Sequence, residues 1–196
     1  MKRHKMDYRN YIRDNVLNKI ESPIVSVFYK LKISPNLLSV FGLILGIIAA
    51  VLIGLNNLIL AAIFLIFGAV ADLFDGSLAR KYGKESVFGA FLDSVIDRIQ
   101  ELAIFIGATY LFINQENYEW AILPIITLGL SFLVSYARAR GEGLGIQMKE
   151  SGIVTRPERL IILLIGLFTN QFIIAMVIVC LTSLISFIQR LRTISK

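Results

Sequence analysis

The sequence predicts an all-α membrane protein with six transmembrane helices, preceded by an amphipathic helix at the membrane interface. Three observations predict this fold class: 56% of the 196 residues are hydrophobic and 17% are charged, the mean hydropathy is +0.72, and long apolar runs alternate with short polar links. A soluble domain of ordinary composition carries more charge. Since a helix needs about 20 apolar residues to span a bilayer, the chain has room for about six crossings and one compact membrane domain.

Residues 1–36 are predicted to form a cytoplasmic or interfacial amphipathic segment. Apolar residues recur there at roughly helical spacing, with basic residues between them, among which are Arg9, Arg13, Lys19 and Lys30. A helix of this kind buries its apolar face in the membrane surface while its basic side chains contact anionic head groups. The alternative is a soluble cap that packs on the helix bundle.

Residues 37–192 are predicted to form a six-helix transmembrane domain. The apolar runs cover residues 37–55, 58–79, 87–113, 120–137, 157–169 and 171–189. The fifth run is short for a hydrocarbon core of about 30 Å. That helix must therefore begin before Pro157, tilt little or meet a thin region of the bilayer.

The basic residues orient the predicted bundle. Apart from Arg98, the 20 Lys and Arg residues lie before Leu37, in every second link or after Ile188, and the other links have none. With six crossings, all the basic segments fall on one side of the membrane. The positive-inside rule then predicts a multi-pass protein of the cell membrane with both termini, and any site at that end of the bundle, in the cytoplasm.

Four aspartates interrupt or flank the apolar segments: Asp72, Asp75, Asp93 and Asp97. Each charge costs roughly 2.5 to 3.5 kcal/mol at the centre of a bilayer on the insertion scale. Spacings of three and four residues put each pair on one face of its helix. The link over residues 80–86 is short enough for the two helices to run antiparallel, so we expect all four carboxylates to share one site.

Carboxylates gathered in this way repel one another unless a cation lies between them. Oxygen ligands without His or Cys favour Mg²⁺ or Mn²⁺, and a pair of such ions about 3.5 to 4 Å apart suits displacement at phosphorus. Two alternatives stay open at this point. The aspartates could form salt bridges with Arg80 and Arg98, or they could line the path of an ion-coupled membrane transporter.

The acidic stretch has fixed spacings over 26 residues. It reads Asp72-x-x-Asp75-Gly76-x-x-Ala79-Arg80, eight further residues, and Gly89-x-x-x-Asp93-x-x-x-Asp97. This pattern resembles the signature of the CDP-alcohol phosphatidyltransferase family at every fixed position and in both gaps, and the expected helices extend the resemblance over nearly the whole chain. The resemblance implies a membrane enzyme, commonly a homodimer, that transfers a lipid phosphoryl group from a CDP-linked lipid to an alcohol and releases CMP.

The resemblance also implies roles for single residues. Asp72, Asp75 and Asp93 would ligate one metal ion, and Asp72, Asp93 and Asp97 would contribute to a second. Asp97 would in addition be the catalytic base that takes the proton of the acceptor hydroxyl. The implied contacts of the CDP-linked lipid are Gly76, Ala79, Arg80, Pro35 and Asn36. Residues 37–192 would then be the catalytic domain, with membrane lipids and a second copy of the chain as partners, and no nucleic acid.

Residues 135–145 and 156–160 resemble the branch of the family that uses inositol 1-phosphate as acceptor. A phosphorylated polyol is a dianion at neutral pH, and guanidinium groups suit a phosphate. The candidate acceptor-phosphate residues are Arg138, Arg159, Arg156 and Arg192, with Arg190 as a further contributor; the alternative is that these residues only anchor loops. Glycerol 3-phosphate is the nearest competing acceptor and serine ranks third, and the lipid tail could be that of CDP-archaeol or CDP-diacylglycerol.

Overall fold

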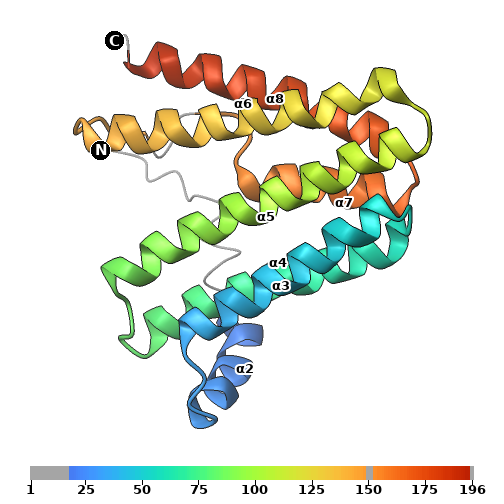
Figure 1. Cartoon of the computed structure of the whole chain (residues 1–196). Helices are drawn as coiled ribbons and strands as arrows, with labels where there is room; N and C mark the ends of the chain where they lie inside the picture. The colour runs from blue at the N-terminus through green and yellow to red at the C-terminus, as the bar shows by residue number, and fades with distance from the viewer. Residues whose placement is uncertain (1–17, 149–151, 195–196) are drawn as a thin grey trace.

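The computed structural model describes residues 18–148 and 152–194, which form seven helices and no strand (Figure 1). The helices are α2 (Asn18–Lys30), α3 (Pro35–Gly54), α4 (Leu58–Lys81), α5 (Val87–Asn114), α6 (Tyr118–Gly143), α7 (Arg156–Phe168) and α8 (Phe172–Ile194). The all-α fold class and the positions of the six apolar runs are therefore confirmed. The first half of the expected amphipathic segment, residues 1–17, lies outside the described residues.

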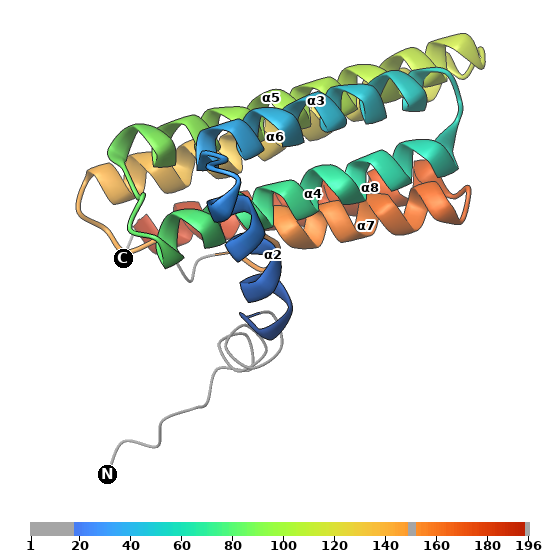
Figure 2. The same cartoon turned by 90° about the horizontal axis from the view of Figure 1, so that it is seen from below.

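Six of the helices form a closed ring. Each helix packs against two neighbours in the order α3, α4, α7, α8, α6, α5 and back to α3. Seen from below, α3, α5 and α6 make one layer and α4, α7 and α8 make the other (Figure 2). Among the described helices, α4 and α5 are not packed against each other, so their side chains can meet only across the interior of the ring.

The interior of the ring is apolar at one end. Buried side chains from five of the helices meet there, among them Ile53, Leu65, Phe105, Phe112 and Met176. Because lipid tails are as apolar as these side chains, close van der Waals packing, and not transfer out of water, is what this cluster contributes to holding the helices together.

Within the described residues, four helices are long and apolar enough to cross a membrane: α3, α4, α6 and α8. The chain is thus an integral membrane protein by length and composition of its helices. The helix α5 has 28 residues but carries the charged residues Asp93, Asp97, Arg98 and Glu101, and α7 has only 13 residues.

The helices α3 and α5 begin at the end of the ring that holds the polar residues, and a serine caps each of them. Ser34 accepts a hydrogen bond from the backbone N–H of Leu37 at 3.2 Å, and Pro35 follows as the first residue of α3. Ser86 accepts from the backbone N–H of Gly89 at 2.9 Å and begins α5 in the same way. Both serines satisfy N–H groups that a helix start leaves unpaired.

The helix α2 leaves the ring at an angle and contacts it mainly near the start of α3 and the end of α4 (Figure 2). Val25 packs with Leu38 and Leu78, and Tyr29 stacks on Tyr82 with ring centroids 3.7 Å apart. The described part of the amphipathic segment is therefore joined to the ring by an apolar contact of its own.

Small residues let α3 approach its neighbours closely. A Cβ atom at Gly42 would lie 3.2 Å from the carbonyl oxygen of Gly68, and one at Gly46 would lie 3.0 Å from the side chain of Gln100. The Gly42-x-x-x-Gly46 pattern thus serves packing within the chain. Gly107 is tighter still, because a Cβ atom there would collide with the backbone carbonyl of Ala50.

We expect Gly107→Ala to destabilise the protein, since the carbonyl of Ala50 is part of a helix and cannot yield as a side chain can. Overpacking of this kind costs about 1 to 3 kcal/mol, and the midpoint of thermal unfolding should fall by about 2 to 4 °C for each kcal/mol. The matched control is Gly129→Ala in α6, where the new Cβ atom meets nothing within 4 Å. Equal melting temperatures for both variants would contradict the close contact of α3 and α5.

Candidate active site

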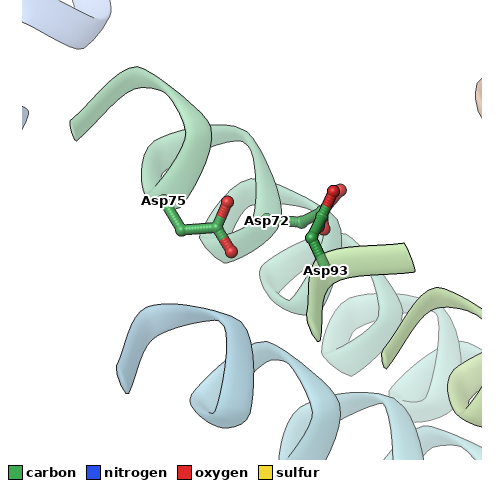
Figure 3. Close-up of side chains that lie close together, drawn as sticks. All are labelled: Asp72, Asp75 and Asp93. Atoms are coloured by element: carbon green, nitrogen blue, oxygen red, sulfur yellow. The ribbon is translucent and has the colours of Figure 1, made fainter. Parts of the chain in front are cut away.

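Three of the four aspartates meet across the ring. Asp72 and Asp75 extend from α4, Asp93 extends from α5, and one carboxylate oxygen of each lies within 4.8 Å of the others. Figure 3 shows the three side chains directed into the same space between the two helices. The expectation that the acidic faces of these helices converge is confirmed for these three residues.

Asp75 is the most buried of the three and is held by α3. The side-chain hydroxyl of Ser39 donates a hydrogen bond of 2.5 Å to Oδ2 of Asp75. Sequence analysis did not identify Ser39, although a serine inside an apolar run was a signal that could have found it. This contact ties the carboxylate of Asp75 to α3.

Asp97 extends from the turn after Asp93 and meets an arginine. The Nη1 atom of Arg156, at the start of α7, lies 2.5 Å from Oδ1 of Asp97 and 3.1 Å from Oδ2 of Asp72. Its Nη2 atom donates to Oε1 of Gln100 at 2.6 Å. Arg156, which was expected to bind acceptor phosphate, lies in the lining of the larger cavity described below and also forms ion pairs with two of the aspartates.

The donor set fits a hard divalent cation. Three carboxylates on two facing helices, with no His or Cys among them, offer the oxygen ligands that Mg²⁺ and Mn²⁺ prefer. Arg98 also lies near the cluster, with its Nη2 atom 3.8 Å from Oδ2 of Asp97. Two guanidinium groups cannot neutralise four carboxylates, so the cluster keeps negative charge to offer an ion.

One side of the aspartate cluster opens into a cavity of about 200 Å³, here called the glycine cavity. All five residues expected to contact a CDP-linked lipid line it: Pro35, Asn36, Gly76, Ala79 and Arg80. A Cβ atom at Gly76 would lie 2.9 Å from Nη1 of Arg80, so the missing side chain lets the guanidinium lie against the helix. Arg80 is fixed there by a hydrogen bond of 3.2 Å to the hydroxyl of Ser77.

The other side opens into a cavity of about 1000 Å³, here called the arginine cavity. Its lining includes five arginines from four helices: Arg98, Arg138, Arg156, Arg159 and Arg190. Arg138 lies at the rim and forms an ion pair of 2.9 Å with Glu142. The cavity therefore suits an anion with more than one negative charge.

The two arginines near the end of α8 differ at this cavity. Arg192 was a candidate for the acceptor phosphate, but it is exposed and does not line the cavity. Arg190, two residues earlier and expected as a further contributor, lines it and donates to the backbone carbonyl of Val134. The helical turn explains the difference, because residues two apart on a helix point in different directions.

Asp93 lines both cavities, and Asp97 lines the arginine cavity. The acidic cluster thus lies at the boundary between the two cavities. The glycine cavity has small residues and one arginine, whereas the arginine cavity has five arginines. Such a boundary is where a group bound on one side can react with a group bound on the other.

Comparison with known proteins gives one family. The profile of the CDP-alcohol phosphatidyltransferases matches residues 32–188. Among curated relatives, the archaetidylinositol phosphate synthase of Pyrococcus horikoshii is 36% identical over 91% of this chain and 94% of its own length. The phosphatidylinositol phosphate synthase of Corynebacterium glutamicum is 38% identical over 76% of this chain and 68% of its own length.

Solved structures agree with the sequence relatives. The phosphatidylinositol phosphate synthase of Mycobacterium tuberculosis, in complex with manganese and citrate, superposes with a TM-score of 0.83 at 28% identity, covering 90% of this chain and 89% of its own. The same enzyme with CDP-DAG bound gives a TM-score of 0.82 at 29% identity, covering 90% and 94% of the two chains.

We expect Asp93→Asn to lower the affinity for Mn²⁺ by more than about tenfold, because the amide offers no charge to the ion, and changes even in groups that merely support metal ligands cost that much. Binding can be measured on the purified protein by the loss of the electron paramagnetic resonance signal of free Mn²⁺. Glu119→Gln, at the exposed start of α6, is the matched control and should bind as the wild type does. Equal affinities for both variants would remove Asp93 from the metal site.

Proposed function

The chain belongs to the CDP-alcohol phosphatidyltransferase family, and we propose that it transfers the phosphoryl group of a CDP-linked lipid to inositol 1-phosphate and releases CMP. It is a metal-dependent transferase of phospholipid biosynthesis. The observation that carries this function is the position of Asp93, which lines both the glycine cavity and the arginine cavity, with Asp97 next to it on the arginine side. Two substrates that enter from opposite sides would meet at these carboxylates.

The glycine cavity suits the CDP-linked lipid. Gly76 and Ala79 leave the backbone of α4 open to close approach, and Arg80 supplies a fixed positive charge for diphosphate oxygens. Pro35 and Asn36 lie at the start of α3, where they can contact the cytidine. CDP-archaeol and CDP-diacylglycerol share the head group that these residues would recognise.

The aspartates would hold two ions of Mg²⁺ or Mn²⁺, with Asp72, Asp75 and Asp93 around one and Asp72, Asp93 and Asp97 around the other. Ions bound there neutralise the diphosphate and stabilise the oxygen that leaves with CMP. Arg156 already lies between Asp72 and Asp97. This contact supports a second cation position next to the three-carboxylate cluster.

Asp97 would act as the base. The hydroxyl of the acceptor attacks the lipid-linked phosphorus, a new P–O bond forms, and the P–O bond to CMP breaks with its electron pair on CMP. The proton of the hydroxyl passes to the carboxylate of Asp97, which lines the cavity on the acceptor side.

Arg138, Arg156 and Arg159 support a phosphorylated acceptor, since they line one cavity. Arg192 does not line it and would act only at longer range. Inositol 1-phosphate is favoured over glycerol 3-phosphate because the two curated relatives named above make inositol phosphate lipids. An ion-coupled transporter would need no pair of cavities with such different linings.

The same proposal includes the arrangement in the membrane. All six helices of the ring would cross the membrane, with α5 and α7 held between the four apolar helices. Both termini and the site would lie in the cytoplasm, and residues 18–30 would lie at the membrane interface. The basic links support this orientation. The 13 residues of α7 span about 20 Å, so preceding residues would complete its crossing.

The family resemblance supports a homodimer, which mass measurement in lipid nanodiscs would test.

The test of the reaction is CMP release by the purified protein with CDP-diacylglycerol or CDP-archaeol and Mg²⁺ or Mn²⁺. The acceptor panel is inositol 1-phosphate, glycerol 3-phosphate, serine and free inositol. We expect release with inositol 1-phosphate and little with free inositol, because only the phosphorylated form engages the arginines. Reaction with glycerol 3-phosphate alone would overturn the choice of acceptor, and no CMP release with any acceptor would overturn the reaction.

Asp97→Asn should lower kcat by about 10² to 10⁴, the usual contribution of a positioned base, while the protein still binds the CDP-linked lipid. Single-turnover CMP release together with equilibrium binding of the lipid separates the two effects. Near-normal turnover in this variant would show that Asp97 is not the base.

A further inference from the structure

A buried ionic network lies behind the arginine cavity, and the roles described so far do not use it. Its centre is Glu101 on α5, whose side chain is 11% exposed. Oε2 of Glu101 lies 3.0 Å from Nη1 of Arg98, and Oε1 lies 3.0 Å from Nη2 of Arg159. The hydroxyl of Ser131 donates a further hydrogen bond of 2.5 Å to Oε1. One carboxylate therefore joins α5, α6 and α7.

Glu101 itself does not line the arginine cavity, whereas both of its arginines do. Arg98 is held a second time by the hydroxyl of Ser135 on α6. Arg159 is almost fully buried, and its Nε–H is buried without a hydrogen-bond partner in the described part of the chain. A buried donor left over in this way is costly unless a ligand accepts from it.

Gln100, the residue before Glu101, also holds an arginine of α7 in place. Gln100 accepts from Arg156 at 2.6 Å, so two successive residues of α5 hold the two arginines of the first turn of α7. Among the described contacts α7 packs against α4 and α8 and not against α5, so these side chains bridge the ring interior. Without them, both arginines would be free to turn toward other carboxylates.

We propose that Glu101 is a positioning residue for the acceptor: it holds Arg98 and Arg159 in the orientation in which their remaining donors bind the acceptor phosphate. This inference rests on the proposed function. Fixed donors bind a dianion better than mobile ones, because the ordering of the side chains is complete before the ligand arrives. The carboxylate also keeps two neighbouring guanidinium groups from repelling each other.

Glu101→Gln tests this inference, since the amide keeps the size of the side chain and removes its charge. We expect the KM for inositol 1-phosphate to rise about tenfold, with the KM for the CDP-linked lipid within about twofold of the wild type. Ser131→Ala is the milder variant and should raise the acceptor KM by a smaller factor. Glu119→Gln, exposed at the far end of α5 and α6, is the control and should change neither KM.

A second readout needs no turnover. Inorganic phosphate alone should raise the melting temperature of the wild type, and this increase should be lost in Glu101→Gln. An unchanged or lower acceptor KM, or an equal loss for both substrates, would overturn the positioning role while the wild type still releases CMP. A wild type without CMP release would instead overturn the proposed function, and the phosphate shift would still report on Glu101. If Glu101→Gln does not fold, Ser131→Ala decides by the same two measurements.

Discussion

Negative charge inside an apolar ring of helices is the constraint on which the rest of the structure depends. Four aspartates in or near membrane-spanning segments would cost on the order of 10 kcal/mol if nothing compensated them. The protein compensates part of this charge with Arg156 and, at Asp75, with the hydroxyl of Ser39. What remains is a negative site that suits divalent cations, and under the proposed function the two substrates would meet there.

The ring explains how such a site can exist without unfolding the bundle. Since α4 and α5 face each other across the interior, their carboxylates meet without direct packing of the two helices. One end of the interior is filled by apolar side chains, and the other holds the charged groups. The two cavities on either side of the aspartates then receive different linings because different helices border them, with α3 and α4 on one side and α6, α7 and α8 on the other.

The sequence predicted the helices and the convergence of three aspartates well because both follow from local spacing. Hydropathy located the six apolar runs, and the intervals between Asp72, Asp75 and Asp93 put their side chains on facing surfaces. Long-range contacts were not predictable in the same way. The bridge of Arg156 to Asp72, the hydrogen bond of Ser39 to Asp75 and the exposure of Arg192 depend on how distant helices pack. Only the polarity of single residues inside apolar runs, such as Gln100, pointed to them.

The most direct test is anomalous diffraction from crystals of the protein grown with Mn²⁺. We expect an anomalous peak within coordination distance of Asp72, Asp75 and Asp93, at the boundary between the glycine and arginine cavities. The absence of a peak there at a saturating concentration of Mn²⁺, with the three carboxylates turned apart or satisfied by arginine alone, would contradict a metal site at these aspartates.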